Sequence, residues 1–215
     1  MINWNTITKT QRNWDQTRPI TQEQAQAIAE RVRSTLTKQN IPWYDVYYTI
    51  DPKLISAMFD VSRQISNDQG QLNAPMLVWF AHDEQYVRNH INNNRYIESD
   101  DIKNKSTINR NVSFSYGLAV AWTITAAVDL GYSAGATQCY DNDVMQQLLI
   151  DKSNGDFDTS INMITGFHGV KISGVMVGIG HAREDLPHNQ PRDTSVSVPR
   201  LPNVKRVFHI GRKGT

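Results

Sequence analysis

The sequence predicts an α+β protein, because helical and strand-like patterns alternate irregularly along the chain. Thr21 and Gln24 have the spacing of a capping box and precede apolar residues at helical intervals. Residues 75–81 are a short unbroken apolar run, as in a central strand buried on both faces. Residues 170–179 give a further strand pattern. This irregular order favours an α+β or three-layer arrangement over a doubly wound parallel sheet.

The first predicted helix is followed by a strand and a second helix. Residues 45–50 are rich in β-branched and aromatic side chains, which predicts a strand. Asp51 and Pro52 then provide an N-cap and a proline at the first helical position, and helical spacing continues to residue 65. The apolar positions expected on the inner side of the first helix are Ala25, Ile28, Ala29, Val32 and Leu36.

The middle of the chain predicts one long apolar helix. Residues 84–111 are polar and rich in asparagine, and we predict helix followed by loop there. The apolar helix is expected over residues 113–130, with Gly131 just beyond its C-terminus. Several hydroxyl side chains and Asp129 interrupt it, so it is expected to be buried and not to span a membrane. A helix apolar nearly all round needs a cover, which makes it a candidate dimer interface.

The C-terminal part of the chain predicts shorter elements. Residues 134–138 are expected to form a short strand or extended turn, and Asp141 or Asp143 can cap the helix that follows. Residues 151–160 have the composition of a loop. The chain of 215 residues needs only one domain, with residues 181–215 as an extended C-terminal arm.

Composition narrows the function classes. The chain has 22 basic and 21 acidic residues, a net charge of +1, which gives no field that gathers nucleic acid or an acidic membrane. The single cysteine, Cys139, cannot form an intramolecular disulfide, and no Cys/His spacing matches a zinc site, so no metal is expected. The N-terminal residues lack the pattern of a signal peptide, and we expect a cytoplasmic protein.

A basic and hydroxyl cluster at residues 8–15 is the clearest functional feature. It contains Thr8, Lys9, Thr10 and Arg12 and stands just ahead of the first helix. Two cations and two hydroxyls can hold a phosphate through charge-assisted hydrogen bonds. The alternative is a solvated N-terminal arm.

Several single residues are predicted to be structural. A lone cysteine such as Cys139 is more often a small buried side chain than a nucleophile. His181 at the end of a strand is expected to be a hydrogen-bonded structural imidazole. Trp43, Trp79 and Trp122 lie in apolar runs and are expected in the core.

Five segments follow one another in a set order and spacing over roughly residues 6–192. They are Thr8 to Asp15 with the helix start at residues 20–25, Pro42-Trp43, residues 74–81, Leu130 to Asp141, and Val177 to His181 with Glu184-Asp185 following. In this order and spacing they resemble the FMN-dependent nitroreductase family.

The resemblance implies a nitroreductase-like three-layer α/β/α fold with a mostly antiparallel central sheet. It also implies an intertwined homodimer with two FMN sites at the subunit interface. In such proteins NAD(P)H leaves a hydride on the flavin, and a nitroaromatic, quinone or similar small-molecule acceptor then takes the electrons. The flavin supplies this chemistry, so no catalytic side chain is required.

The resemblance also assigns cofactor-binding residues. Thr10, with Lys9 beside it, falls at the family's phosphate-binding serine, and Arg192 is the candidate late cation on the same phosphate. Arg12 falls where the family places a cation near the flavin pyrimidine, where it would stabilise the anion that develops at N1.

The remaining assigned positions are also departures from the family pattern. Gln138 and Cys139 fall where backbone N–H groups meet flavin N5, in place of a Glu-Gly pair. Gln39 stands for the asparagine that contacts the ring, Ile41 for a neighbouring glutamine, and Thr8 for an arginine. Losing one phosphate cation could cost on the order of 1–3 kcal/mol, which Lys9 offsets in part.

Two other functions remain open at this point. These departures are compatible with a protein that binds flavin on the same fold with little or no turnover. A structural or interaction protein that has lost the cofactor is the third possibility, with residues 92–111 as its partner surface. Residues 151–169 form a longer link than the family usually has, so the resemblance constrains the substrate poorly.

Overall fold

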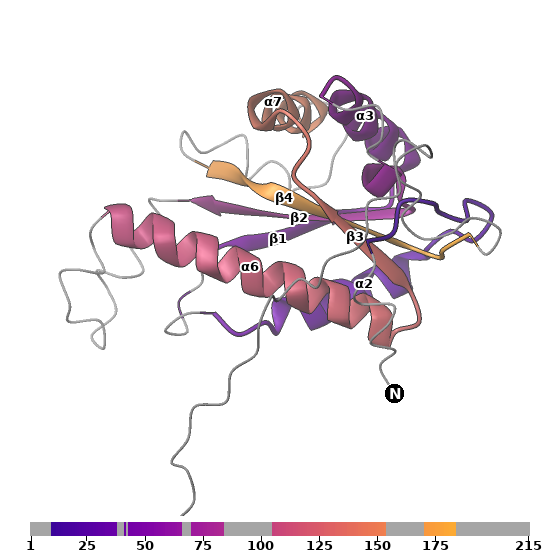
Figure 1. The fold of residues 1–215 in the computed structure, drawn as a ribbon, viewed down its shortest axis with the longest axis horizontal. Helices are drawn as coiled ribbons and strands as arrows, with labels where there is room; N and C mark the ends of the chain where they lie inside the picture. The colour runs from indigo at the N-terminus through magenta and orange to yellow at the C-terminus, as the bar shows by residue number, and fades with distance from the viewer. Residues whose placement is uncertain are drawn as a thin grey trace, which may run out of the picture.

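The computed structural model describes residues 10–37, 41, 43–65, 70–83, 105–153 and 170–183. These residues form an antiparallel sheet of four strands in the order β1-β2-β4-β3, with helices on both faces (Figure 1). The predicted α+β, three-layer fold is therefore confirmed. The strands are β1 (Asp45–Thr49), β2 (Met76–Asp83), β3 (Ser133–Thr137) and β4 (Val170–Gly180). The helices are α2 (Gln22–Arg33), α3 (Pro52–Arg63), α6 (Lys105–Asp129), α7 (Asn142–Ser153) and the short 3-10 helix η2 (Gly70–Asn73).

Strand β2 lies in the middle of the sheet, between β1 and β4, as its unbroken apolar run predicts. Successive side chains of a strand point to opposite faces. Met76, Val78 and Phe80 pack with α2 and α6 on one face. Leu77 and Trp79 pack with α3 and α7 on the other. All five side chains are fully buried, so this strand belongs to both cores.

The predicted start signals of α2 and α3 are both present. The Thr21 hydroxyl accepts a hydrogen bond from the Gln24 amide at 3.3 Å, and the Gln24 side chain accepts one from the Thr21 amide at 2.8 Å. Asp51 accepts a hydrogen bond from the Lys53 amide at 2.8 Å, with Pro52 at the first helical position. Each cap satisfies backbone donors that the first helical turn leaves without partners.

Helix α7 is capped by Asp141 and not by Asp143, the other candidate. The Asp141 carboxylate accepts hydrogen bonds from the amides of Asp143 at 2.9 Å and Val144 at 3.1 Å. The helix continues to Ser153, so the loop predicted over residues 151–160 is wrong for its first three residues. The predicted inner position Leu36 is also wrong. It lies beyond the end of α2 and is 82 % exposed.

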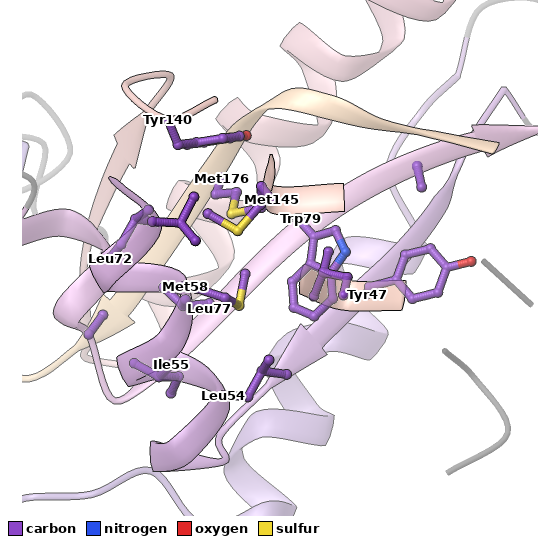
Figure 2. Close-up of a cluster of buried hydrophobic side chains, with 14 of the residues drawn as sticks. Tyr47, Leu54, Ile55, Met58, Leu72, Leu77, Trp79, Tyr140, Met145 and Met176 are labelled. Carbon is purple, nitrogen blue, oxygen red and sulfur yellow. The ribbon is translucent and has the colours of Figure 1, made fainter. Parts of the chain in front are cut away.

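Figure 2 shows the buried cluster between the sheet and the helices α3 and α7. Trp79 stacks on Tyr47, with ring centroids 5.9 Å apart and an interplanar angle of 16°. Met58, Met145 and Met176 come from α3, α7 and β4 and fill the middle of the cluster. Unbranched methionine side chains adapt to the irregular space between elements that meet at different angles.

Helix α6 is longer than predicted and ends as predicted. It begins at Lys105, whereas the pattern gave a helix from residue 113 and a loop before it. At its C-terminus Gly131 has a φ of 87°. The Gly131 amide donates to the Val128 carbonyl and the Tyr132 amide to the Ala127 carbonyl, which is a Schellman motif.

The outer side of α6 carries an apolar row that we call the α6 stripe: Phe114, Leu118 and Trp122. The three residues are four positions apart and therefore share one side of the helix. They are 56 %, 37 % and 45 % exposed, so the prediction of Trp122 as a core residue is wrong. Its indole N–H donates to the Arg31 carbonyl at 2.8 Å, which holds one edge of the ring while the rest faces outward.

Residues Thr107–Asp129 of α6 are long and apolar enough to cross a membrane by length and composition alone. The sequence predicts a buried helix that falls short of spanning a membrane and is a candidate dimer interface. Core helices pass the same test, and the inner side of α6 packs on the sheet, where the Tyr116 and Phe80 rings lie 6.0 Å apart.

Candidate functional site

The N-terminal segment at residues 10–15 lies against the sheet where β3 begins and β4 ends. The Gln11 amide donates to the Ala134 carbonyl of β3 at 3.0 Å. Just beyond β4, the Asp15 amide donates to the His181 carbonyl at 2.8 Å, and Trp14 forms a β-bridge with Ala182. These bonds fix the segment that contains Thr10 and Arg12 on the sheet, so it is not a free arm.

Two glycines allow this close packing. A Cβ atom added at Gly135 of β3 would overlap the Gln11 carbonyl oxygen, and one added at Gly70 would lie 2.5 Å from the Arg12 carbonyl oxygen. The Trp14 indole N–H also donates to the Gly70 carbonyl at 2.6 Å. Only a residue without a side chain lets two backbones approach so closely. The segment is therefore held between β3 and η2.

Among the buried polar atoms in and beside this segment, Nε of Arg12 and Oε1 of Gln71 have no hydrogen-bond partner within the part of the chain that the structure describes. Gln71 follows Gly70 in η2. Gln71 is only 4 % exposed, and its own carbonyl oxygen packs where a side chain at Gly178 would lie. A buried polar group without a partner costs about 1–3 kcal/mol. One donor and one acceptor are thus available to a polar ligand.

The turn after β3 exposes Gln138 and Cys139 at the surface. The prediction of Cys139 as a buried side chain is therefore wrong. Strand β3 ends at Thr137, whose hydroxyl accepts a hydrogen bond from the Cys139 amide at 3.2 Å. The Tyr140 amide donates to the Gln138 carbonyl at 3.1 Å. The turn is ordered by its own hydrogen bonds while its two central side chains face outward.

The N-terminal segment and this turn belong to one region. Gln11 packs on Gly135, and Gln138 is three residues further along the chain, which is about 10 Å in an extended strand. Thr10 and Arg12 are each partly buried next to Gln11. The structure therefore brings four of the predicted site residues into one neighbourhood: Thr10, Arg12, Gln138 and Cys139.

Three other predicted site residues, Lys9, Gln39 and Arg192, lie outside the described residues. Their roles stay predictions. Two further residues of the region, Gln71 and Thr137, carried no recognisable signal in the sequence. Their relevance comes from burial, from the unpartnered Gln71 oxygen and from the Thr137 bond to the turn.

The rim of this region holds a few ionisable groups. Partial burial lowers the pKa of His181, the nearby Arg18 lowers it further, and the Asp15 carboxylate opposes both effects. The His181 ring also lies 4.9 Å from the Tyr132 ring. Burial raises the pKa of the Tyr140 phenol. No group of three or more His, Cys, Asp or Glu side chains that could hold a metal ion occurs among the described residues.

Nitroreductases are among the solved structures that this chain resembles. NfrA1 of Bacillus megaterium matches with a TM-score of 0.63 and 18 % identity, covering 96 % of this chain and 72 % of that one. A candidate nitroreductase of Exiguobacterium sibiricum 255-15, solved in complex with FMN, matches with a TM-score of 0.60 and 13 % identity, covering 94 % of each chain. The protein has the nitroreductase fold.

This fold hosts more than one activity. A gut-bacterial enone reductase of fatty-acid saturation shares it, with a TM-score of 0.60, 15 % identity, and coverage of 93 % of this chain and 100 % of that one. No protein-family model matches the sequence, and no curated protein matches it. The fold is thus established by structure, and function has to be argued from the site.

Proposed function

We propose that the protein is an FMN-dependent oxidoreductase that passes a hydride from NAD(P)H through flavin N5 to a nitroaromatic, quinone or similar acceptor. One observation carries the proposal: the N-terminal segment is packed on β3 through Gly135, beside a turn that exposes Gln138 and Cys139. The nitroreductase fold, which one neighbour presents in complex with FMN, supports it.

The residues present fit a flavin. The flavin pyrimidine edge carries both carbonyl acceptors and an N–H donor. Arg12 Nε and Gln71 Oε1 are a buried donor and a buried acceptor without partners in the described chain. A ligand with such an edge would relieve both desolvation costs at once. When bound, FMN supplies hydride transfer, and the protein has to bind, orient and tune it.

We assign the following roles to the chain. The Thr10 hydroxyl and the Lys9 and Arg192 side chains would hold the phosphate through charge-assisted hydrogen bonds. Arg12 would place positive charge beside the pyrimidine, where it stabilises developing negative charge. Gln39 would contact the ring, and the backbone amides of Gln138 and Cys139 would line its reactive edge.

We also propose that the protein works as a homodimer formed through the α6 stripe. Its three large apolar side chains are exposed on one side of a helix that has no charged residue between Arg110 and Asp129. Gly117, on the same outer surface, has no atom near the position of an added Cβ, so the surface there is open to a close approach. An isologous contact between two copies would cover the same stripe on both.

The absorption spectrum of freshly purified protein tests the cofactor. We expect a yellow protein with stoichiometric FMN, whose colour bleaches when NAD(P)H is added without oxygen and returns with a quinone or nitrofuran. Protein that stays colourless in excess FMN would overturn the proposal.

Two matched pairs of variants test the site. Arg12→Ala is expected to weaken FMN binding by about tenfold or more, since charged hydrogen bonds contribute about 1.5–3 kcal/mol. Arg33→Ala, which removes an exposed cation paired with Glu30, should leave it unchanged. Gly135→Ala should displace the N-terminal segment and abolish binding, whereas Ser56→Ala at an exposed position of α3 should not. Equal effects within either pair would mean that the site lies elsewhere.

A flavin-binding protein with little turnover is the second candidate. One observation favours it, namely that the Cys139 amide already has a hydrogen-bond partner in Thr137 and is not free for a ligand. Bound FMN that NAD(P)H reduces slowly or not at all would select this function over the first.

A further inference from the structure

Thr137 is buried at the end of β3, directly before the exposed turn. It is 6 % exposed, and in the sheet it stands opposite Met176 of β4. The Met176 side chain is fully buried in the cluster of Figure 2, so the sheet position next to Thr137 is firmly packed. The Thr137 hydroxyl is thus placed by the core and not by the turn itself.

The Thr137 hydroxyl accepts the hydrogen bond of the Cys139 amide. Each backbone N–H is a single donor, so this amide cannot give a second full-strength hydrogen bond to a ligand. The neighbouring Tyr140 amide is directed to the Gln138 carbonyl. The Thr137 hydroxyl therefore engages the Cys139 amide, while the Tyr140 amide is engaged within the turn.

The Thr137 hydroxyl and flavin N5 would compete for the Cys139 amide, and the outcome matters because N5 changes from a hydrogen-bond acceptor to an N–H group on reduction. Oxidised flavin N5 carries a lone pair and accepts a hydrogen bond. Reduced N5 carries a hydrogen and no longer needs a donor. An amide aimed at N5 therefore stabilises the oxidised ring relative to the reduced ring, and withholding that amide does the reverse.

We propose that Thr137 is a positioning residue that withholds the Cys139 amide from N5 and so shifts the preference of the site toward reduced flavin. The inference rests on the proposed function, because it takes the turn as the neighbour of N5. It adds Thr137 as a residue beyond those that were assigned to contact FMN, and it predicts that the Thr137 hydroxyl favours binding of the reduced form over the oxidised form.

The test compares Thr137→Val with the wild-type protein. Valine keeps the β-branched shape and removes the hydroxyl. Dissociation constants for FMN and for dithionite-reduced FMN are measured anaerobically by calorimetry. We expect the variant to bind oxidised FMN roughly threefold to tenfold more tightly, because the freed amide adds one neutral hydrogen bond to the complex. Binding of reduced FMN should be unchanged. Thr137→Ser, which keeps the hydroxyl, should restore the wild-type ratio.

A readout without ligand accompanies this measurement. Hydrogen exchange of the Cys139 amide, followed by NMR in the flavin-free protein, should be faster in Thr137→Val and close to wild type in Thr137→Ser. Thr123→Val is the matched control, because Thr123 is also buried but its hydroxyl donates to the Ala119 carbonyl within α6. It should change neither the exchange rate nor the ratio.

The outcomes separate the two proposals. An unchanged ratio of the two dissociation constants, or equal weakening of both, would overturn the role of Thr137 while FMN binding itself stands. A wild-type protein that binds no FMN in either state would overturn the proposed function and this inference together. An unchanged Cys139 exchange rate in Thr137→Val would show that the hydroxyl does not hold the amide, and would also overturn it.

Discussion

The two faces of the sheet are covered in different ways. Helices α3 and α7 turn most of their apolar side chains inward, and Leu54, Met58 and Met145 are at most 1 % exposed. Helix α6 covers the other face with apolar residues on its inner side and presents Phe114 and Leu118 on its outer side as well. The first face leaves Val144 as a single exposed large apolar residue on its described helices α3 and α7, whereas the second ends in a row of three.

The difference shows that the composition of a helix indicates on how many sides other protein surfaces have to cover it. An amphipathic helix buries its apolar side against one neighbour and exposes its polar side to water. A helix without charged residues over most of its length has no strongly polar side, so packing on the sheet buries its inner side and leaves apolar residues exposed on its outer side. A contiguous exposed apolar surface of this kind marks an interaction site. This is the physical basis of our proposal that the α6 stripe contacts a second copy.

The largest expected loss of stability comes from a substitution on the sheet face that α3 and α7 cover. Trp79→Ala should lower the free energy of unfolding by about 3–5 kcal/mol, because Trp79 is fully buried and stacked on Tyr47. Trp122→Ala on the stripe should cost the isolated subunit far less, since that ring is half exposed. Urea unfolding at low protein concentration measures both. Comparable losses of unfolding free energy in the two variants would contradict the view that Trp79 is a core residue and Trp122 a surface residue.

A charge on the α6 stripe should separate the subunits. Leu118→Glu is expected to raise the dimer dissociation constant at least about a hundredfold, which corresponds to about 2.7 kcal/mol, while the subunit stays folded. Val144→Glu is the matched control, because Val144 is a similarly exposed apolar residue on α7, with 40 % exposure against 37 % for Leu118. Sedimentation equilibrium gives the constants. Loss of the dimer in both variants, or a monomeric wild type, would refute the assignment.

Helix caps on the two faces provide a smaller comparison. Asp141→Ala at the start of α7 should cost about 1 kcal/mol, and somewhat more than Thr21→Ala at the start of α2, because Asp141 receives two amide hydrogen bonds and Thr21 one. Asp141→Ser retains a capping oxygen and should recover most of the loss. Urea midpoints measure the order. A serine variant as unstable as the alanine variant would show that capping is not the cause.

The smallest effect is a pH dependence at His181, which packs on Tyr132 of the α6-side cluster. Burial and Arg18 lower its pKa in the folded state, so the unfolded chain takes up the proton first as the pH falls. The contribution of neutral His181 is complete above the unfolded pKa of about 6.5 and is lost as the pH falls toward the lower folded pKa.

His181→Gln should therefore flatten the decline of the unfolding free energy between about pH 7 and pH 5. Wild-type and variant urea midpoints measured across this range give the difference. A steeper decline in the variant would mean that the folded state favours the charged imidazole instead.

Part of the candidate site was predictable from the sequence. The cluster at residues 8–15 and the turn at Gln138 were identified from residue types and from the family resemblance. Their proximity was not, because the Gln11 contact with Ala134 joins distant parts of the chain. Gln71 and Thr137 escaped notice because an ordinary polar residue becomes informative only when its burial and its partners are known.

The sequence by itself determined the local features. The capping box at Thr21, the proline start of α3 and the glycine that ends α6 each depend on hydrogen bonds or spacing within a few residues. Such short-range terms are present wherever the segment lies.

Only the tertiary structure decided which side chains are exposed and which distant parts of the chain are in contact. It placed Leu36, Trp122 and Cys139 at the surface, where their apolar or small side chains had suggested burial. It also showed that Gly135 is needed for the passage of Gln11. Burial depends on what the rest of the chain leaves room for, and this is settled by packing among distant residues and not by the local pattern.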